Sequence, residues 1–149
     1  MAGIVNSIQS VLRGGSPSMV AADMLGLEVA TRAAVRSAVT THGMLLQAAV
    51  KRNASRSRAE PSVAGLGPRI QTGQYVASIG LALAESRGTY IASVGSNAAQ
   101  ARRLELGFHG RDAAGRNART EPHPHYAPAL EAITPRFEAA MAAIGVPKK

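Results

Sequence analysis

A single long helical pattern is the feature that most constrains the fold of this chain. Apolar residues recur at helical spacing from Met19 to Arg58. The apolar stripe consists of Val20, Met24, Leu27, Thr31, Val35, Ala38, His42, Leu45, Leu46 and Ala49. At 1.5 Å per residue such a helix is about 60 Å long, more than the core of a 149-residue chain covers. We therefore expect part of this helix to contact another subunit or to project, and Gly43 to mark a bend or a close helix contact.

A β-hairpin pattern follows the long helix. Apolar and small residues alternate over Tyr75–Ala84, which predicts a strand, with one helical turn before it as an alternative. The turn falls at Glu85–Gly88, and Thr89–Val94 is the returning strand. A short helix is then predicted over Ala98–Leu106, and Gly107 provides its C-terminal stop.

The last third combines a polar loop with a terminal helix. Residues 109–121 are rich in Gly, Arg, Asn and Ala, so we expect a mobile loop, with a third strand around Phe108 as an alternative. Pro128 fits the first turn of the final helix, which Pro135 should kink or restart. Its apolar face comprises Leu130, Ile133, Phe137, Met141 and Ile144. The order of elements predicts an α+β fold, with a long N-terminal helix and C-terminal helices packed on a small antiparallel sheet.

Composition shifts divide the chain into three parts. Residues 1–18 form an N-terminal arm and linker, residues 19–145 a single domain, and residues 146–149 a tail. The arm carries apolar residues at helical spacing and is either a short amphipathic helix, a docking arm or a frayed terminus. These apolar residues are Ile4, Val5, Ile8, Val11 and Leu12.

The composition predicts a thin core. Aromatic residues make up only 3% of the chain and Trp is absent, so most apolar side chains are small and bury little area each. We therefore expect partner subunits to contribute to stability. The absence of cysteine excludes disulfides and thiolate metal sites. The sequence begins without the basic start of a secretory signal and holds no apolar run long enough to span a membrane, so synthesis in the cytoplasm and no membrane partner are expected.

The chain is strongly basic, with a formal charge of +8 that favours polyanions or acidic protein surfaces. Two sets of basic residues are candidates for facing DNA or an acidic partner. The first set is Lys51, Arg52, Arg56 and Arg58, and the second set is Arg111, Arg116 and Arg119. Neither set is interleaved with aromatic residues, so a base-stacking surface is not indicated. A solvated helix end or loop remains the plainer interpretation of each set.

No constellation of residues indicates catalysis, a metal or a cofactor. His109, His123 and His125 lack a completing ligand and match no closed zinc site, and His42 lies on the apolar stripe of the long helix. No serine sits in a Gly-x-Ser-x-Gly turn. Glu105 is expected to pair with Arg102 or with a neighbouring subunit. The sequence therefore predicts a non-enzymatic protein.

Four ordered segments resemble the tail-completion, or head–tail joining, proteins of long-tailed phages, the lambda-Z-like family. They are Thr72-Gly73-Gln74-Tyr75-Val76-Ala77-Ser78-Ile79, Val94-Gly95, Gln100-Ala101-Arg102-Arg103-Leu104-Glu105-Leu106-Gly107, and Pro122-His123-Pro124-His125-Tyr126-Ala127-Pro128-Ala129-Leu130. Tyr75 stands at the usual Leu position and Gln100 at the usual Tyr position. His125 stands at the usual Phe position, and the aromatic Tyr126 follows one place later. The stretch between Phe108 and Pro122 and the N-terminal arm are longer than the family needs.

The resemblance implies a structural virion protein, made in the host bacterial cytoplasm. It implies a homo-oligomeric ring, commonly sixfold, in the neck of the particle. The ring would lie between the head-side connector or stopper and the tail terminator or tube. Genomic double-stranded DNA would pass through it. Candidate contacts within the ring or to its neighbours are Leu45, Leu46, Tyr75, Glu105, Phe108, His125 and Tyr126. The alternatives are a small basic nucleic-acid-binding module and, without nameable catalytic residues, a toxin or small hydrolase.

Overall fold

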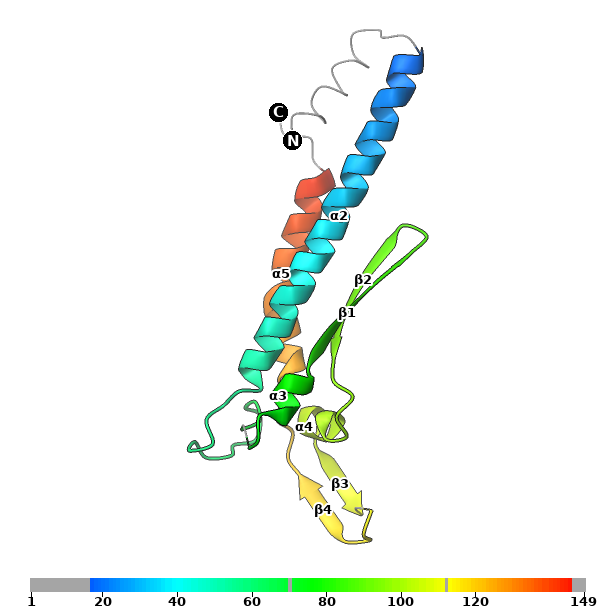
Figure 1. Cartoon of the computed structure of the whole chain (residues 1–149). Helices are drawn as coiled ribbons and strands as arrows, with labels where there is room; N and C mark the ends of the chain where they lie inside the picture. The colour runs from blue at the N-terminus through cyan, green and yellow to red at the C-terminus, as the bar shows by residue number, and fades with distance from the viewer. Residues whose placement is uncertain (1–16, 70, 112, 146–149) are drawn as a thin grey trace.

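The protein is an elongated α+β structure built around two antiparallel helices (Figure 1). The computed structural model describes residues 17–69, 71–111 and 113–145. The elements are α2 (Pro17–Asn53), α3 (Gln74–Ser78), β1 (Gly80–Ser86), β2 (Thr89–Gly95), α4 (Ala101–Leu106), β3 (Phe108–Arg111), β4 (Asn117–Thr120) and α5 (Tyr126–Gly145). The predicted α+β class is confirmed, with two separate two-stranded antiparallel sheets in place of one.

The other elements are arranged around helix α2, and α5 packs along it in the opposite direction (Figure 1). Proline at its first position suits a helix start, because the missing N–H would have no intrahelical partner there. The helix ends at Asn53, earlier than the pattern predicted, so Arg56 and Arg58 lie in the following loop. The first turns of α2 extend beyond Gly145, the last residue of α5 (Figure 1).

The β1–β2 hairpin packs on another side of α2 and needs a glycine to do so. Its two-residue turn places Arg87 at φ 49° and Gly88 at φ 79°, as a tight hairpin requires. A Cβ atom on Gly43 of α2 would lie 2.8 Å from the Cβ of Ala92 and 3.1 Å from Cδ1 of Leu81. The close contact expected at Gly43 is therefore with the hairpin and not with another helix.

One expectation about the remaining elements is confirmed and two are corrected. The helical turn expected at the start of the first strand segment is α3, which holds Tyr75, and the strand begins at Gly80. Residues 109–121 are not simply a loop, because His109 pairs with Arg119 in the β3–β4 hairpin, and the strand at Phe108 belongs to this second sheet. Helix α5 continues through Pro135, which is exposed, so that the carbonyl deprived of its hydrogen bond faces water.

The core is small and lies where α2, α3 and α5 meet. The buried apolar residues of the described ranges are Ala49, Val50, Ala54, Ile79, Ala129 and Ile133. Leu46, Tyr75, Val76, Val94 and Tyr126 pack against them. Many large apolar side chains remain outside, including Val29 at 68% and Leu106 at 67% exposure. The buried residues therefore form the thin core that the composition predicted.

The predicted terminal segments fall largely outside this description. Of the proposed arm over residues 1–18, only Pro17 and Ser18 are described, and both belong to α2. The apolar pattern of the arm and the tail at 146–149 lie outside the described residues.

Candidate functional site

Glu105, on α4, accepts hydrogen bonds from the first backbone N–H groups of α5. The N–H groups of His125 and Tyr126 donate to its Oε2 at 2.8 and 3.1 Å, and that of Ala127 donates to its Oε1 at 3.0 Å. A helix leaves such groups without intrahelical partners, and their dipoles favour a negative charge. The expected partner of Glu105, Arg102 or another subunit, is therefore replaced by the N-terminus of α5.

The same contacts set the charge of the Glu105 carboxylate. Burial alone would raise its pKa. The backbone N–H groups of His125, Ala127 and Tyr126, together with the nearby imidazole, outweigh burial and lower the pKa of Glu105 below its ordinary value. The group is therefore ionised at neutral pH and holds α4 to α5 through charge-assisted hydrogen bonds.

His125 is fully buried, and both of its ring nitrogens are engaged. Nδ1 lies 2.9 Å from the carbonyl oxygen of His123 and 3.0 Å from Oε2 of Glu105. A proton on Nδ1 satisfies these acceptors and leaves Nε2 to accept from the hydroxyl of Tyr75, 2.5 Å away. Burial first, and then Tyr126 and Glu105 nearby, raise the pKa of Tyr75, so its phenol stays protonated and donates.

We call Tyr75, Glu105, His125 and Tyr126 the polar hub. Its residues come from α3, α4 and the start of α5, and Asn53 at the end of α2 adds a hydrogen bond from Nδ2 to the carbonyl of His125 at 3.2 Å. Every main helix thus meets at the hub. The buried imidazole and the bound carboxylate together hold these helices to one another.

The hub contains four of the sequence-based interface candidates and overturns one of them. Tyr75, Glu105, His125 and Tyr126 were expected to contact neighbouring subunits, and their polar atoms or rings contact one another within the chain. The side chain of His125 has no exposed surface left for a neighbour. The other three side chains are half-buried, so their contact with a neighbour stays a prediction. The N-terminus of α5 and the folded position of α3 draw these residues inward.

The other three interface candidates differ in their surroundings. Leu45 is 40% exposed on α2, whereas Leu46 is half-buried against the core. Phe108 is half-buried, with the guanidinium of Arg103 lying 4.4 Å from its ring centroid. Of these, Leu45 is the residue best placed for contact with a neighbour.

Removing the Tyr75 hydroxyl should destabilise the protein. Tyr75→Phe leaves the buried Nε2 of His125 without its donor, and we expect the free energy of unfolding to fall by about 1–3 kcal/mol. Tyr90→Phe is the matched control, since it removes the same hydroxyl from β2, outside the polar hub. Urea unfolding of both variants measures the difference. Equal losses would mean that the Tyr75–His125 contact does not stabilise the fold.

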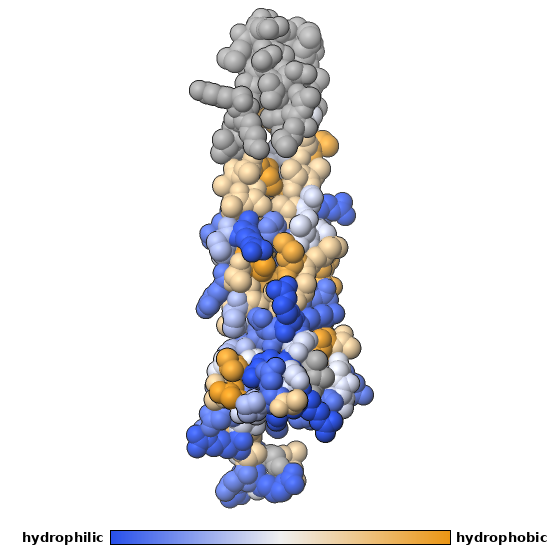
Figure 2. Space-filling model, turned by 90° about the vertical axis from the view of Figure 1, so that its left-hand side faces the viewer, coloured by the Kyte–Doolittle hydropathy of each residue, from blue (hydrophilic) through white to orange (hydrophobic). Residues whose placement is uncertain are grey.

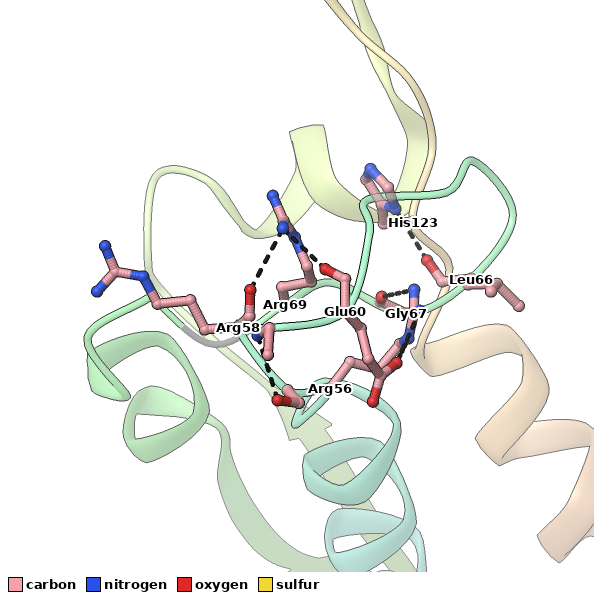
Figure 3. A network of polar contacts seen from close by, with 9 residues as sticks. Arg56, Arg58, Glu60, Leu66, Gly67, Arg69 and His123 are labelled. Atoms are coloured by element: carbon pink, nitrogen blue, oxygen red, sulfur yellow. Dashed lines mark hydrogen bonds and ion pairs between the residues drawn. The ribbon is translucent and has the colours of Figure 1, made fainter.

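Arg56, from the first basic set, and Arg69 tie down the loop after α2 (Figure 3). Arg56 forms an ion pair with Glu60 at 2.9 Å and donates to the carbonyl of Gly67 at 3.3 Å. Arg69 donates to the carbonyls of Glu60 at 2.8 Å and Arg58 at 3.4 Å. Arg69 was not among the residues predicted from the sequence, because nothing in the local pattern links it to residues nine and eleven positions earlier. Within the first basic set, Arg56 is thus engaged through its guanidinium, whereas Arg58 takes part through its carbonyl.

The loop should open locally when Arg69 is removed. In Arg69→Ala the two carbonyls lose their donor, so we expect tryptic cleavage after Arg58 to accelerate several-fold with a small change in global stability, about 1 kcal/mol or less. Arg52→Ala, at an exposed residue of α2, is the control of equal charge. Mass spectrometry of the early fragments reports the rate at Arg58. Identical rates in both variants would contradict a tethering role for Arg69.

The second arginine set lies on the β3–β4 hairpin, at the same end of the molecule as the loop (Figure 1). Arg111, Arg116 and Arg119 are all exposed, and Arg119 forms a 2.7 Å ion pair with Glu121. The structure thus brings the two sets to one basic end. Hydrophilic residues predominate there in Figure 2.

His42 and His123 serve as packing and hydrogen-bonding groups. Nδ1 of His42 lies 2.8 Å from the carbonyl of Ala38, and its ring meets Phe137 edge-on. Nδ1 of His123 lies 2.9 Å from the carbonyl of Leu66, which ties the loop to the chain before α5. Within the described ranges no three His, Cys, Asp or Glu residues are grouped as a metal site would require.

No protein-family model matches the chain, and no curated protein or solved structure is significantly similar to it. Among the described helices, none is long and apolar enough to cross a membrane.

Proposed function

We propose that this chain is a structural subunit of a phage neck, resembling tail-completion proteins. In this proposal identical copies form a ring, with six subunits as the expected number, between the head-side connector and the tail terminator or tube. Genomic DNA passes through the ring. The protein would act in the virion, after synthesis in the host bacterium, and would have no catalytic activity.

The observation that carries this proposal is that the buried core is small for so elongated a molecule. The buried apolar residues are few and mostly small, while α2 extends past α5 and large apolar side chains stay exposed. Exposed examples lie on three separate elements, namely Met44 on α2, Ile91 on β2 and Leu130 on α5. Apolar surface of this kind is buried when subunits associate. Contacts that use different faces of each copy close into a ring when the rotation between copies closes.

The polar hub supports the same proposal. A subunit that must keep its shape between two neighbouring rings benefits from an internal clamp, and the Glu105–α5 contact is such a clamp. The hub also explains part of the motif resemblance, because Glu105, His125 and Tyr126 all lie in the segments that carry it. We infer that those segments specify the subunit fold more than the contacts between subunits.

The test is whether the chain is part of the assembled particle. Immunoblotting of purified virions should detect the chain. A phage whose genome lacks the gene should accumulate separate heads and tails, which electron micrographs would show. Complete, infectious particles without the chain would refute the proposal. Mass photometry of the chain, alone and with its connector and terminator proteins, then gives the number of subunits.

A free nucleic-acid-binding module is the second candidate, and the basic end favours it. The two functions differ in one measurement. A dedicated DNA-binding module should bind duplex tightly at physiological salt as an isolated chain, whereas a ring subunit should bind measurably only at low salt.

A further inference from the structure

The β3–β4 hairpin has two chemically different faces. Cross-strand partners project to the same side of a sheet, and successive residues alternate between the sides. The register pairs His109 with Arg119 and Arg111 with Asn117, so these four residues share one side. We call it the cationic face. The opposite face carries Phe108, Gly110, Ala118 and Thr120.

The two faces also differ in exposure. Phe108, Ala118 and Thr120 are half-buried, and Arg103 of α4 lies against the Phe108 ring. All four residues of the cationic face are exposed. The hairpin projects from the basic end of the molecule, away from the long helices (Figure 1). The cationic face is therefore the side of the hairpin that is free to meet a partner.

We propose that the cationic face binds the phosphate backbone of double-stranded DNA. This inference rests on the proposed function, in which DNA passes through the ring, and it assigns the contact to Arg111 and Arg119. These two arginines occupy diagonal positions across the strands, which places their backbones about 7–8 Å apart. Two guanidinium groups on one face can thus engage separate phosphates, each with paired N–H donors. The imidazole of His109 and the amide of Asn117 add further donors.

The chemistry of this face favours duplex DNA over other macromolecules. It has no Phe, Tyr or Trp side chain on which the bases of a single strand could stack. It has no apolar side chain to form the centre of a protein interface. Arg119 is bound to Glu121 at 2.7 Å, but this pair is largely exposed, so a phosphate can replace the carboxylate at little cost.

The same argument separates the two arginine sets. In the loop after α2, Arg56 and Arg69 donate to Glu60 and to backbone carbonyls, so those guanidinium groups are already committed. The hairpin arginines Arg111 and Arg119 should therefore contribute more to the salt-dependent DNA binding than Arg56 and Arg69 do.

The salt dependence of duplex binding by the full-length chain tests the proposal. Fluorescence anisotropy with two labelled duplexes of unrelated sequence, from low to moderate salt, gives the slope of log K against log salt. In the double variant Arg111→Ala/Arg119→Ala the slope should fall by about 2, and both duplexes should behave alike. The control Arg32→Ala/Arg136→Ala removes the same charge from α2 and α5 and should leave the slope unchanged.

Four outcomes would overturn the proposal. They are no duplex binding by the wild-type chain at low salt, equal slopes in the two double variants, tighter binding of single strands than of duplex, and tighter binding of an acidic polypeptide than of duplex. The last result would assign the cationic face to an acidic protein. Incorporation of the chain into virions is scored separately. Absence from particles together with the predicted change in slope would refute the ring and leave the DNA contact standing.

Discussion

Replacing Glu105 with alanine is expected to lower the free energy of unfolding by about 3 kcal/mol. The variant leaves three N–H groups at the start of α5 without an acceptor and removes a carboxylate from beside the buried imidazole of His125. Each loss is of the kind that costs about 1 kcal/mol or more when the group stays out of water. Urea unfolding, followed by circular dichroism, measures the change. Glu131→Ala, at an exposed position of α5, is the control and should change stability little.

The contribution of Glu105 should also depend on pH, in a direction that its lowered pKa fixes. A folded-state pKa below the ordinary value of 4.5 means that the unfolded chain binds the proton more readily. The stabilisation is therefore complete above about pH 5 and is lost as pH falls through the folded-state pKa. The stability gap between wild type and Glu105→Gln should narrow from neutral pH towards pH 3. A gap that stays constant or widens in acid would contradict this role of the carboxylate.

Glu105 also marks the limit of prediction from the sequence. The sequence offers Arg102 as a partner one helical turn away, and local spacing is all that a single sequence displays. The actual partners lie at the start of α5, and their position depends on how α4 and α5 meet. Likewise, Tyr75 and His125 are separated by 50 positions, so their contact follows from packing alone.

Local patterns did predict the elements that depend on neighbouring residues. The turn between β1 and β2 follows from Gly88, and α4 stops at Gly107, which has φ 75°. The two long helices follow from their apolar stripes. The sequence predicts a loop where the β3–β4 hairpin lies, because Gly110, the alanines and Gly115 give no β-forming signal. Its strands instead continue directly from α4 and lead into α5, so the fold brings them together.

The second large effect concerns Gly43, the position at which the β1–β2 hairpin approaches α2. We expect Gly43→Leu to lower the free energy of unfolding by more than about 3 kcal/mol. Even the first carbon of the new side chain would lie 2.8 Å from the Cβ of Ala92, closer than such atoms approach one another. The larger side chain would also meet Leu81, so the hairpin must move away from the helix.

The same helix provides the control that separates this clash from helix propensity. Gly26 also lies in α2, but a Cβ there would meet no other atom within 4 Å. Gly26→Leu should therefore stabilise the protein by about 0.5–1 kcal/mol, because leucine is the better helix former. Gly43→Leu gains the same propensity and still loses stability, so opposite signs isolate the hairpin contact. If both variants were stabilised, the hairpin would not rest on α2 at Gly43. If the exposed apolar face of the β1–β2 hairpin contacts neighbouring subunits, as we propose, Gly43→Leu should in addition weaken ring assembly at temperatures where the variant remains folded.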